Sequence, residues 1–367
     1  MQPNSSVILL QLSLIEGVGG GTINFLLSRL GEKLNSLLSL SLAELVALGL
    51  PEKRAQLIWA GIRDDTLLKK ELDLMDRHAV QWASCLDSAY PKRLLTIVNP
   101  PPIIYWQGYL PDQQKAALAV VGARAANHYG KQVVDQIVPK LVEAGAVIIS
   151  GGALGADSMA HRAALIAGGQ TVVVCGAGLL HYYPKSHQRL FEQILKQGGA
   201  LISTYSMETL PMAGNFPARN RIIAGLSDGC LVVQAAAQSG ARITALHAME
   251  QGREVFVVPG LFGDVLSAGC HDLIQQGAKL VHSVGDILSD LIGIDEAQHA
   301  ADQVNEAVEL GVADLIMQFC MRPQTLTDLH AKLPDLDWDA LQGHLFELQL
   351  QGRLNQNFAG LWVRGLT

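Results

Sequence analysis

The strongest constraint on the fold of this chain is a series of short apolar segments that alternate with longer, helix-length segments. The apolar segments are rich in Val, Ile, Leu and Ala and lack polar alternation, which is typical of strands buried on both faces of a parallel sheet. Because each intervening segment is long enough for a crossover helix, the pattern predicts a doubly wound, Rossmann-like α/β domain over residues 117–290. We expect its strands at 117–121, 146–150, 171–175, 200–203, 229–234, 254–258 and 279–281.

The flanking segments have different patterns. Residues 1–70 are leucine-rich with helical spacing and predict a small helical domain of the SAM or helix-hairpin-helix type. Its Gly17-Val18-Gly19 turn can present backbone amides to a DNA phosphate, but it contains no Lys or Arg, so a plain structural hairpin is the preferred interpretation. Residues 71–116 are expected to form a linker with a first edge strand, and 291–306 a polar linker. Over 307–367, three helical segments followed by a hairpin predict a winged helix.

Composition excludes several classes of protein. Hydrophobic residues make up 49% of the 367 residues and charged residues 17%, which is incompatible with intrinsic disorder. The five cysteines show no C-x-x-C spacing, which argues against a disulfide framework or a zinc knuckle and favours a reducing compartment. The chain begins without a basic signal-peptide region and has no uncharged apolar run of about 18 residues. We therefore expect a soluble, cytoplasmic protein without a membrane span or a bound metal.

Four loops that follow the expected strands carry the candidate site. In parallel sheets, ligands bind where the carboxyl ends of strands meet the N-termini of helices, and these loops are rich in glycine and arginine. Arg219 and Arg221 lie two apart on an expected helix, so one should face a ligand while the other braces the fold. Together the loops predict an anion site, and Phe216 adds a ring on which a base can stack. The candidate residues are Gly122, Arg124, Ser150, Gly151, Gly152, Gly155, Phe216, Arg219, Asn220, Arg221, Ser239, Gly240 and Arg242.

Common nucleotide-dependent enzymes are not indicated. The chain has no G-x-x-x-x-G-K-[ST] motif, and the first expected strand is followed by GARAANHYG and not by G-x-G-x-x-G. The second strand ends in Ser150, where a dinucleotide site would need an acidic residue for the ribose. Asp157 and His161 are spaced as an acid–base pair on a helix, although an aspartate that bonds local amides at the helix start is the preferred interpretation. We expect no catalytic residue and no cofactor.

The order of these loops resembles a known family. The segments VVGAR, SGGALGADSMAHRAAL, YYP, FPARNRIIAGLSDGCLVV, SGARITALHAMEQGREVFVVPG and GCHDLIQQGA resemble the DNA processing protein A family, also called Smf. The resemblance spans about 90–290 and implies a protein that binds single-stranded DNA, protects it during natural transformation and loads the RecA recombinase. It also implies a homodimer formed through the Rossmann domain and a DNA groove lined by Arg124, the Gly151–Gly155 turn, Phe216, Arg219 and Arg221.

Two alternatives stay open at this point. One is a nucleotide-binding N-glycosidic hydrolase of a related Rossmann group, for which Asp157 is the only good candidate acid, since Thr204 and Gln234 stand where acids could have served. The other is a scaffold for recombination proteins.

The C-terminal segment 305–367 has 4 basic and 8 acidic residues, so phosphate should repel it. The acidic winged helix is therefore expected to contact protein or act as a spacer.

Overall fold

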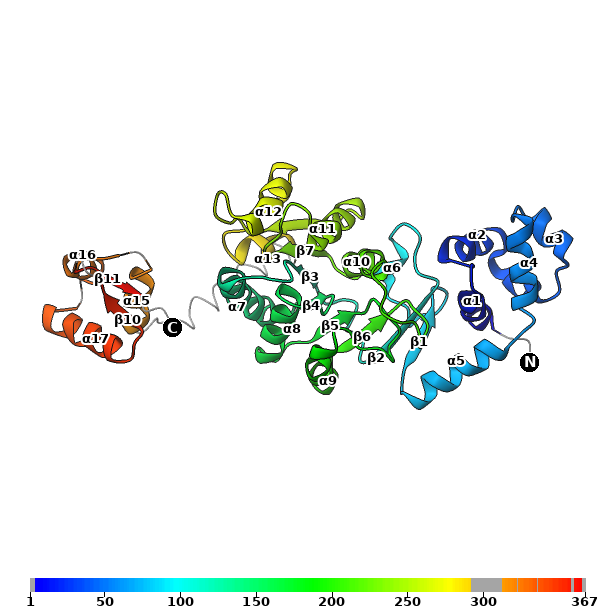
Figure 1. Ribbon diagram of the computed structural model, residues 1–367, viewed down its shortest axis with the longest axis horizontal. Helices are drawn as coiled ribbons and strands as arrows, with labels where there is room; N and C mark the ends of the chain where they lie inside the picture. Colours follow the sequence, from blue (N-terminus) through cyan, green and yellow to red (C-terminus); the bar gives the residue numbers. More distant parts are fainter. Residues whose placement is uncertain (1–3, 292–311, 322, 335, 358–359, 365–367) are drawn as a thin grey trace. The chain divides into compact units, whose positions relative to one another are not determined.

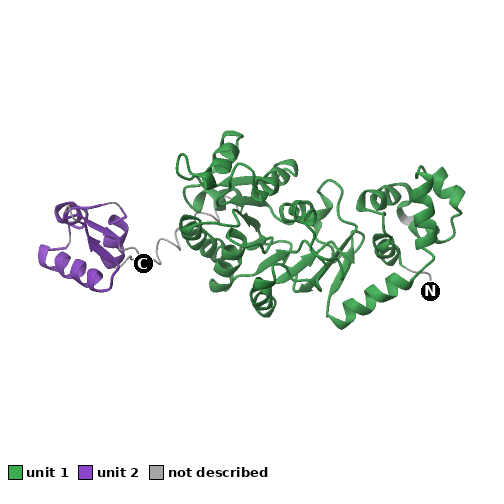
Figure 2. Cartoon of the chain, in the orientation of Figure 1, with its two compact units in different colours: residues 1–300 green, residues 301–367 purple. Residues whose placement is uncertain are grey.

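A computed structural model describes residues 4–291, 312–321, 323–334, 336–357 and 360–364. The chain divides into two compact units, unit 1 over 1–300 and unit 2 over 301–367 (Figure 2). The polar linker expected at 291–306 lies outside the described residues from 292 onward. Unit 1 carries the sheet that the sequence predicts, and unit 2 is a small helical body with a hairpin.

A single mixed sheet organises unit 1 (Figure 1). Its strand order is β1-β2-β6-β5-β4-β3-β7-β8-β9, and the pairs from β6 to β9 are all parallel, whereas β2 pairs antiparallel with both β1 and β6. The expected α/β architecture and its parallel strands are confirmed, with strand ends that differ from the prediction by up to 2 residues. The strands are β1 (Gln81–Ser84), β2 (Ile103–Gly108), β3 (Ala117–Val121), β4 (Val147–Ser150), β5 (Thr171–Val174), β6 (Ala200–Ser203), β7 (Gly229–Val232), β8 (Glu254–Val257) and β9 (Lys279–Leu280).

The central strand β3 shows why the sheet is covered on both faces. Leu118 and Val120 belong to a buried cluster with side chains of α7, α8 and α13. Ala117, Ala119 and Val121 point to the other face and belong to a cluster with α10, α11 and α12. Alternate residues of one strand point to opposite faces, so a strand that is apolar throughout needs a helical layer on each side. Figure 1 shows these two layers.

Local signals set the helix ends. The Asn127 side chain caps α7 by accepting a hydrogen bond from the amide of Gly130 (3.2 Å), and Gly145 has a φ of +83° just past the helix end. Among the described helices, none is both long and apolar enough to cross a membrane. The helices of unit 1 are α1 (Ser5–Leu14), α2 (Gly20–Leu30), η1 (Gly31–Leu38), α3 (Leu42–Ala47), α4 (Glu52–Gly61), α5 (Thr66–Arg77), α6 (Lys92–Leu95), α7 (His128–Glu143), α8 (Ala156–Ile166), η2 (Lys185–His187), α9 (Gln188–Lys196), α10 (Asn215–Gly225), α11 (Gly240–Glu250), α12 (Val265–Gln275) and α13 (Gly285–Leu291).

The N-terminal helices share a core with the sheet. Buried leucines of α1 lie in the same hydrophobic cluster as Ile103 and Tyr105 of β2. The start of α2 rests against the segment before β2, where Asn24 donates to the carbonyl of Pro100 (3.0 Å). The start of α2, which follows the turn after α1, therefore packs against the chain's own segment before β2.

The segment 71–116 is more extensively folded than the linker with one edge strand that the sequence predicts. Helix α5 runs through residue 70, where a domain boundary was expected, and its buried Glu71 accepts a hydrogen bond from the amide of Met207 (2.8 Å). The segment also contributes two strands, β1 and β2, to the sheet. It therefore forms part of the folded core of unit 1.

Unit 2 has its own hydrophobic core, formed by buried side chains of its helices together with Leu354. Residues 358 and 359, within the expected hairpin turn, lie outside the described residues, as does Val308 of the first expected helix. The elements of unit 2 are α15 (Val312–Phe319), α16 (Leu326–Lys332), α17 (Trp338–Leu350), β10 (Leu354–Gln356) and β11 (Trp362–Arg364).

Candidate nucleic-acid interface

The sheet places a cavity at the point where its strand order reverses. Strand β3 pairs with β4 on one side and with β7 on the other, and ligands bind in the crevice at the carboxyl ends of such strands. The cavity found there, called here the strand-end cavity, has a volume of about 420 Å³. Seven of the predicted site residues line it, namely Gly122, Arg124, Phe216, Arg219, Asn220, Ser239 and Gly240.

Arg124 is the exposed cation of this cavity. It makes no hydrogen bond or ion pair within the described part of the chain, and its guanidinium carbon lies 6.0 Å from the ring centroid of Phe216. Phe216 in turn lies 5.2 Å, centroid to centroid, from Tyr183, which is 49% exposed. A guanidinium beside two aromatic rings offers a phosphate partner and stacking surfaces at one place.

A smaller cavity adjoins the first and is called here the aromatic cavity. Its volume is about 50 Å³, and Arg124, Phe216 and Arg219 belong to both cavities. Gly151, Tyr183 and Pro184 complete its wall with Ala153 and Leu154. Sequence reasoning missed Tyr183, although its place in a Tyr-Tyr-Pro segment after β5 was the available signal.

Arg219 braces the site from within. It is 5% exposed and donates to the carbonyl oxygens of Gly151 (2.8 Å) and Val174. These carbonyls lie at the ends of β4 and β5, so one side chain of α10 ties two strand-end loops together. Burial lowers the pKa of the Arg219 guanidinium, and nearby Asp157 opposes that change. This is the bracing role that the sequence predicts for one of the two arginines.

Asp157 occupies part of the glycine-rich loop that was expected to cradle an anion. Its Oδ2 accepts hydrogen bonds from the amides of Gly151 (3.2 Å) and Ala153 (3.3 Å). Burial raises the pKa of the carboxyl group, while Arg219 and the amides lower it. The preferred interpretation of Asp157 as an aspartate that bonds local amides is confirmed. His161 is fully buried and its Nδ1 bonds Thr171 (2.8 Å).

Two glycines are required by close approach of the loops. Gly155 has a φ of +75°, and a Cβ there would collide with the backbone carbonyls of the loop after β3. A Cβ on Gly122 would stand 2.6 Å from the Cβ of Ala156. The glycine loops are therefore packed against each other, which fixes the shape of the cavity wall.

The remaining predicted residues lie outside the strand-end cavity. Arg221 donates to the carbonyl of Asn99 (2.8 Å), in the segment before β2, and Arg242 pairs with Asp272 (3.2 Å). Ser150 is buried and its hydroxyl donates to the carbonyl of Val120 (2.6 Å). Gly152 and Gly155 position the turn before α8 without lining the cavity.

Gln234 holds the loop that presents Arg124. Its Oε1 accepts from the amide of Asn127 (3.1 Å), and its Nε2 donates to the Asn127 side chain (3.0 Å). Because Gln234 follows β7 and Asn127 follows β3, the pair joins the ends of these two strands at the point where the strand order reverses.

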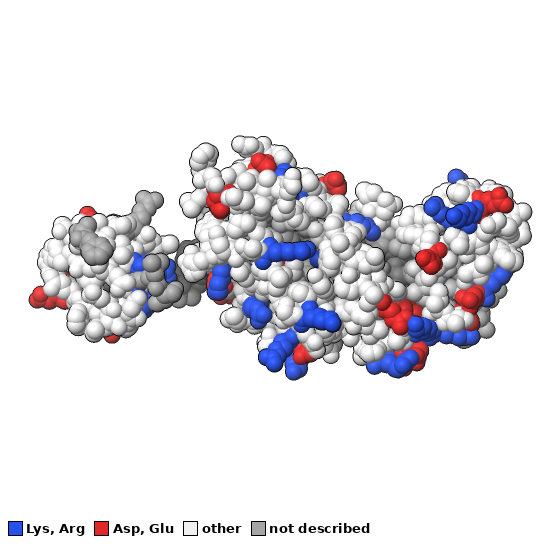
Figure 3. All heavy atoms as spheres, viewed as in Figure 1, with Lys and Arg blue, Asp and Glu red and all other residues white. Residues whose placement is uncertain are grey.

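Figure 3 shows the distribution of charged side chains on one face of the molecule. Lys and Arg side chains gather over the middle of unit 1, whereas acidic and basic side chains mix over its N-terminal helices.

The fold and cavity define a Rossmann-like protein whose cavity at the carboxyl edge of the sheet combines an exposed arginine with two neighbouring aromatic rings. The chain belongs to the DNA recombination-mediator protein A family, whose model matches residues 81–292.

Known relatives agree with this assignment. Protein Smf of Escherichia coli is 46% identical over 202 residues, which are 55% of this chain and 54% of that protein, so the chain matches about half the length of this relative. DNA processing protein DprA of Streptococcus pneumoniae is 42% identical over 227 residues, 62% of this chain and 78% of that protein.

Two solved structures share the fold. The X-ray structure of DNA processing protein A from Streptococcus pneumoniae has a TM-score of 0.69 and 36% identity, and the match covers 79% of this chain and 99% of that one. The structure from Helicobacter pylori, which concerns that protein's unique single-stranded DNA binding mode, has a TM-score of 0.51 and 29% identity. That match covers 58% of this chain and 96% of the other.

Proposed function

We propose that this chain binds single-stranded DNA in the strand-end and aromatic cavities and delivers it to a recombinase. The observation that carries the proposal is Arg124, an exposed guanidinium that has no hydrogen-bond or ion-pair partner among the described residues. It lines both cavities and lies beside Phe216. Membership of the recombination-mediator family and the single-stranded DNA binding of the Helicobacter pylori protein support it.

Each part of the site has a role in this mechanism. Arg124 contacts a phosphate, and Phe216 and Tyr183 stack on bases that are not paired. The N-terminus of α11 adds backbone amides near Gly240, where the cavity wall is open. Arg219 and Asp157 act through the loops that they hold in place. No bond is made or broken, so the proposal includes no catalytic residue.

The test is a salt titration of binding to a fluorescent single-stranded oligonucleotide, with a matched duplex beside it. Arg124→Ala should lower the affinity for single strands and reduce the salt slope by about 0.7, the value of one single-strand phosphate contact. Arg54→Ala, which removes an exposed arginine of α4, is the matched control. Equal binding of single and double strands, or an Arg124→Ala variant that binds like the control, would overturn the proposal.

The contacts at the site argue against the hydrolase alternative. Asp157, its candidate acid, is buried and already accepts two backbone amides. Gln234 stands where a second acid could have served and is engaged by Asn127. Stabilisation of the protein by a nucleoside monophosphate in a thermal-shift experiment, without stabilisation by oligonucleotides, would favour the hydrolase instead.

A homodimer formed through the Rossmann-like domain is a further part of the proposal. The loop between β8 and α12 and the first residue of α12 expose three large apolar side chains, Leu261, Phe262 and Val265, near the β9 edge of the sheet. Such a patch is typical of a protein contact, and two sites on one dimer raise the avidity for long strands. Phe262→Ser should shift the sedimentation equilibrium toward monomer, and an unchanged equilibrium would contradict this surface.

The flanking elements complete the proposal. The N-terminal helices serve as a packed helical domain of the helix-hairpin-helix type, and unit 2 as a winged helix. Helix α17 carries Asp339 and Glu347 and has no Lys or Arg, so phosphate repels it. We infer that unit 2 contacts protein, with RecA recombinase as the expected partner of the full chain. Because unit 2 has its own core, fragment 305–367 can be tested alone, and duplex binding by it would contradict this role.

A further inference from the structure

A second hollow lies on unit 1, away from the strand-end cavity. It is called here the α8–α9 groove and has a volume of about 390 Å³. Its walls come from the second half of α8 and from α9 with the residue that follows it. The lining consists of two cations, two glutamines and two apolar side chains, and it includes no acid. The lining residues are Arg162, Leu165, Ile166, Gln193, Lys196 and Gln197.

The two cations of the groove have no partner in the part of the chain that the structure describes. Arg162 and Lys196 are exposed and make no hydrogen bond or ion pair within the described residues. By contrast, Lys131 on α7 pairs with Asp135 of the same helix. The acid nearest in sequence to Lys196 is Glu192, which accepts a hydrogen bond from Gln188 (3.0 Å). The positive charge of the groove is thus available to an external anion.

A row of cations leads from the aromatic cavity to this groove. Lys185 follows Pro184, which lines the aromatic cavity, and Arg189 lies one turn further along at the start of α9. Arg189, Gln193 and Lys196 are spaced i, i+4 and i+7, so they share one face of α9 over about 10 Å of helix. Figure 3 shows Lys and Arg side chains gathered over α8 and α9.

We propose that the α8–α9 groove is a second contact site for the phosphodiester backbone of single-stranded DNA that leaves the aromatic cavity along α9. This inference rests on the proposed function and extends its site. Arg162 and Lys196 contact phosphates, and the Gln193 and Gln197 amides donate to phosphate or base oxygens. Ile166, which is 87% exposed at the rim, offers apolar contact to an unpaired base.

Continuity favours DNA over an acidic protein segment as the occupant. The row that begins at Lys185 starts beside the ring of Tyr183, where the strand already has a stacking partner. A polyanion with evenly spaced phosphates matches cations placed at intervals along one helix face, and a strand held at one cavity reaches the next contact without a second association step.

The length of the oligonucleotide separates the two contact sites. The double variant Arg162→Gln/Lys196→Gln should bind an oligonucleotide of about 25 nucleotides with about 25-fold lower affinity at about 0.1 M salt, and with a salt slope smaller by about 1.4. An oligonucleotide of about 6 nucleotides, which fills only the strand-end and aromatic cavities, should bind the variant and the wild type equally. Equal binding of the short strand also shows that the variant is folded.

A matched control removes the same charge elsewhere. Lys53→Gln/Arg54→Gln changes two exposed cations of α4 in the same unit. If this control lowers the affinity for the long strand as much as the groove variant does, net charge explains the effect and the inference fails. It fails equally if the groove variant binds the long strand like wild type, the result expected if the groove takes an acidic protein segment. Loss of binding by Arg124→Ala in the same series would leave the proposed function standing in either case.

Discussion

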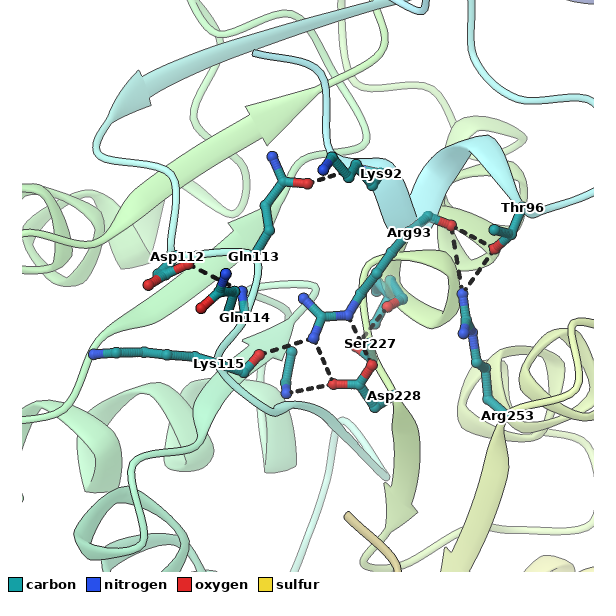
Figure 4. Close-up of polar contacts among 12 residues, drawn as sticks. Lys92, Arg93, Thr96, Asp112, Gln113, Gln114, Lys115, Ser227, Asp228 and Arg253 are labelled. Carbon is teal, nitrogen blue, oxygen red and sulfur yellow. Dashed lines mark hydrogen bonds and ion pairs between the residues drawn. The ribbon is translucent and has the colours of Figure 1, made fainter. Parts of the chain in front are cut away.

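At the amino ends of β3 and β7, the charges of Arg93 and Asp228 are satisfied within the protein. Arg93 donates to both carboxylate oxygens of Asp228 (2.7 and 2.8 Å) and to the carbonyl of Lys115 (2.8 Å), and Asp228 also accepts the amide of Ala117 (2.8 Å) (Figure 4). At the carboxyl ends, Arg124 is exposed and has no such partner within the described residues. An arginine is therefore paired within the protein at one edge of the sheet, whereas an arginine at the other edge is left available to a ligand.

The difference separates structural arginines from those available to a ligand. The amino edge encloses a cavity of about 30 Å³, whereas the strand-end cavity measures about 420 Å³. Arg93 lines the small cavity, and its bidentate ion pair with Asp228 anchors the segment before β3 to the sheet. An unpaired guanidinium beside a large cavity keeps its charge for an external anion. The following predictions test whether stability and DNA binding divide between the two edges in this way.

Asp228→Ala should produce the largest effect, on stability alone. The Asp228 and Arg93 side chains are 31% and 20% exposed, and removal of the carboxylate leaves a guanidinium and a strand amide without their acceptor. We expect the free energy of unfolding to fall by about 3 kcal/mol in urea denaturation. Glu254→Ala, an exposed carboxylate at the start of β8, is the control. A loss of DNA affinity by folded Asp228→Ala protein would break the division between the edges.

Phe216→Leu should act on the other edge, by weakening DNA binding. Leucine keeps the apolar contact with the cavity wall but removes the ring that lies against Tyr183 and Arg124. The affinity for single-stranded DNA should fall by about 2 kcal/mol, or about 30-fold, while the melting temperature changes little. Leu154→Ala, which removes an exposed apolar side chain of the aromatic cavity without a ring, serves as the comparison. Wild-type affinity of the leucine variant would show that Phe216 packs and does not stack.

The sequence predicts the parallel strands because burial on both faces leaves a local signature. It also predicts one edge strand within 71–116, where β2 lies, but it predicts neither β1 nor the antiparallel pairing of β2 with β1 and β6. Strand β1 begins with an exposed glutamine and is not apolar throughout, and β2 pairs Tyr105 with Ser203, far away in sequence. No local pattern encodes a pairing of that kind, so the sequence predicts only a linker with one edge strand over 71–116.

The site shows the same limit. The position of the cavity follows from the topology of a parallel sheet, and the glycine loops mark it in the sequence. The roles of the arginines depend on carbonyl oxygens that distant loops supply, such as that of Gly151 for Arg219 and that of Asn99 for Arg221. The spacing of two arginines on a helix predicts that their side chains point in different directions. It does not predict to which carbonyl oxygens each guanidinium will donate.

His161→Gln should reveal a pH dependence that belongs to the packed part of α8. Burial lowers the pKa of His161 from 6.5 to about 3, so between these values the unfolded chain binds a proton that the folded chain does not. The contribution of neutral His161 to the free energy of unfolding is therefore fully present above pH 6.5 and is lost as the pH falls toward 3. Wild type should lose about 1 kcal/mol of unfolding free energy between about pH 7 and pH 5.5, and the variant correspondingly less.

The control for this prediction is His128→Gln, which removes an exposed histidine at the start of α7. Urea denaturation at both pH values measures each variant. A pH dependence that survives in His161→Gln but disappears in His128→Gln would contradict the assignment. Asp157 cannot supply this loss, because burial raises its carboxyl pKa and acid then relieves the cost of the buried charge.

Gly240→Ala should have the smallest effect and tests the backbone of the carboxyl edge. A Cβ at Gly240, the first residue of α11, meets no atom within 4 Å, so alanine adds helix propensity without a clash. We expect a gain of about 0.5 kcal/mol in the free energy of unfolding. Because the methyl group crowds an amide at the cavity, the affinity for single-stranded DNA should fall about twofold. Gly343→Ala in α17 has equally open space and lies in unit 2, so it should leave the affinity unchanged. If both variants bind DNA equally well, the strand does not approach the α11 amides, and the carboxyl edge holds it through Arg124 and the aromatic rings alone.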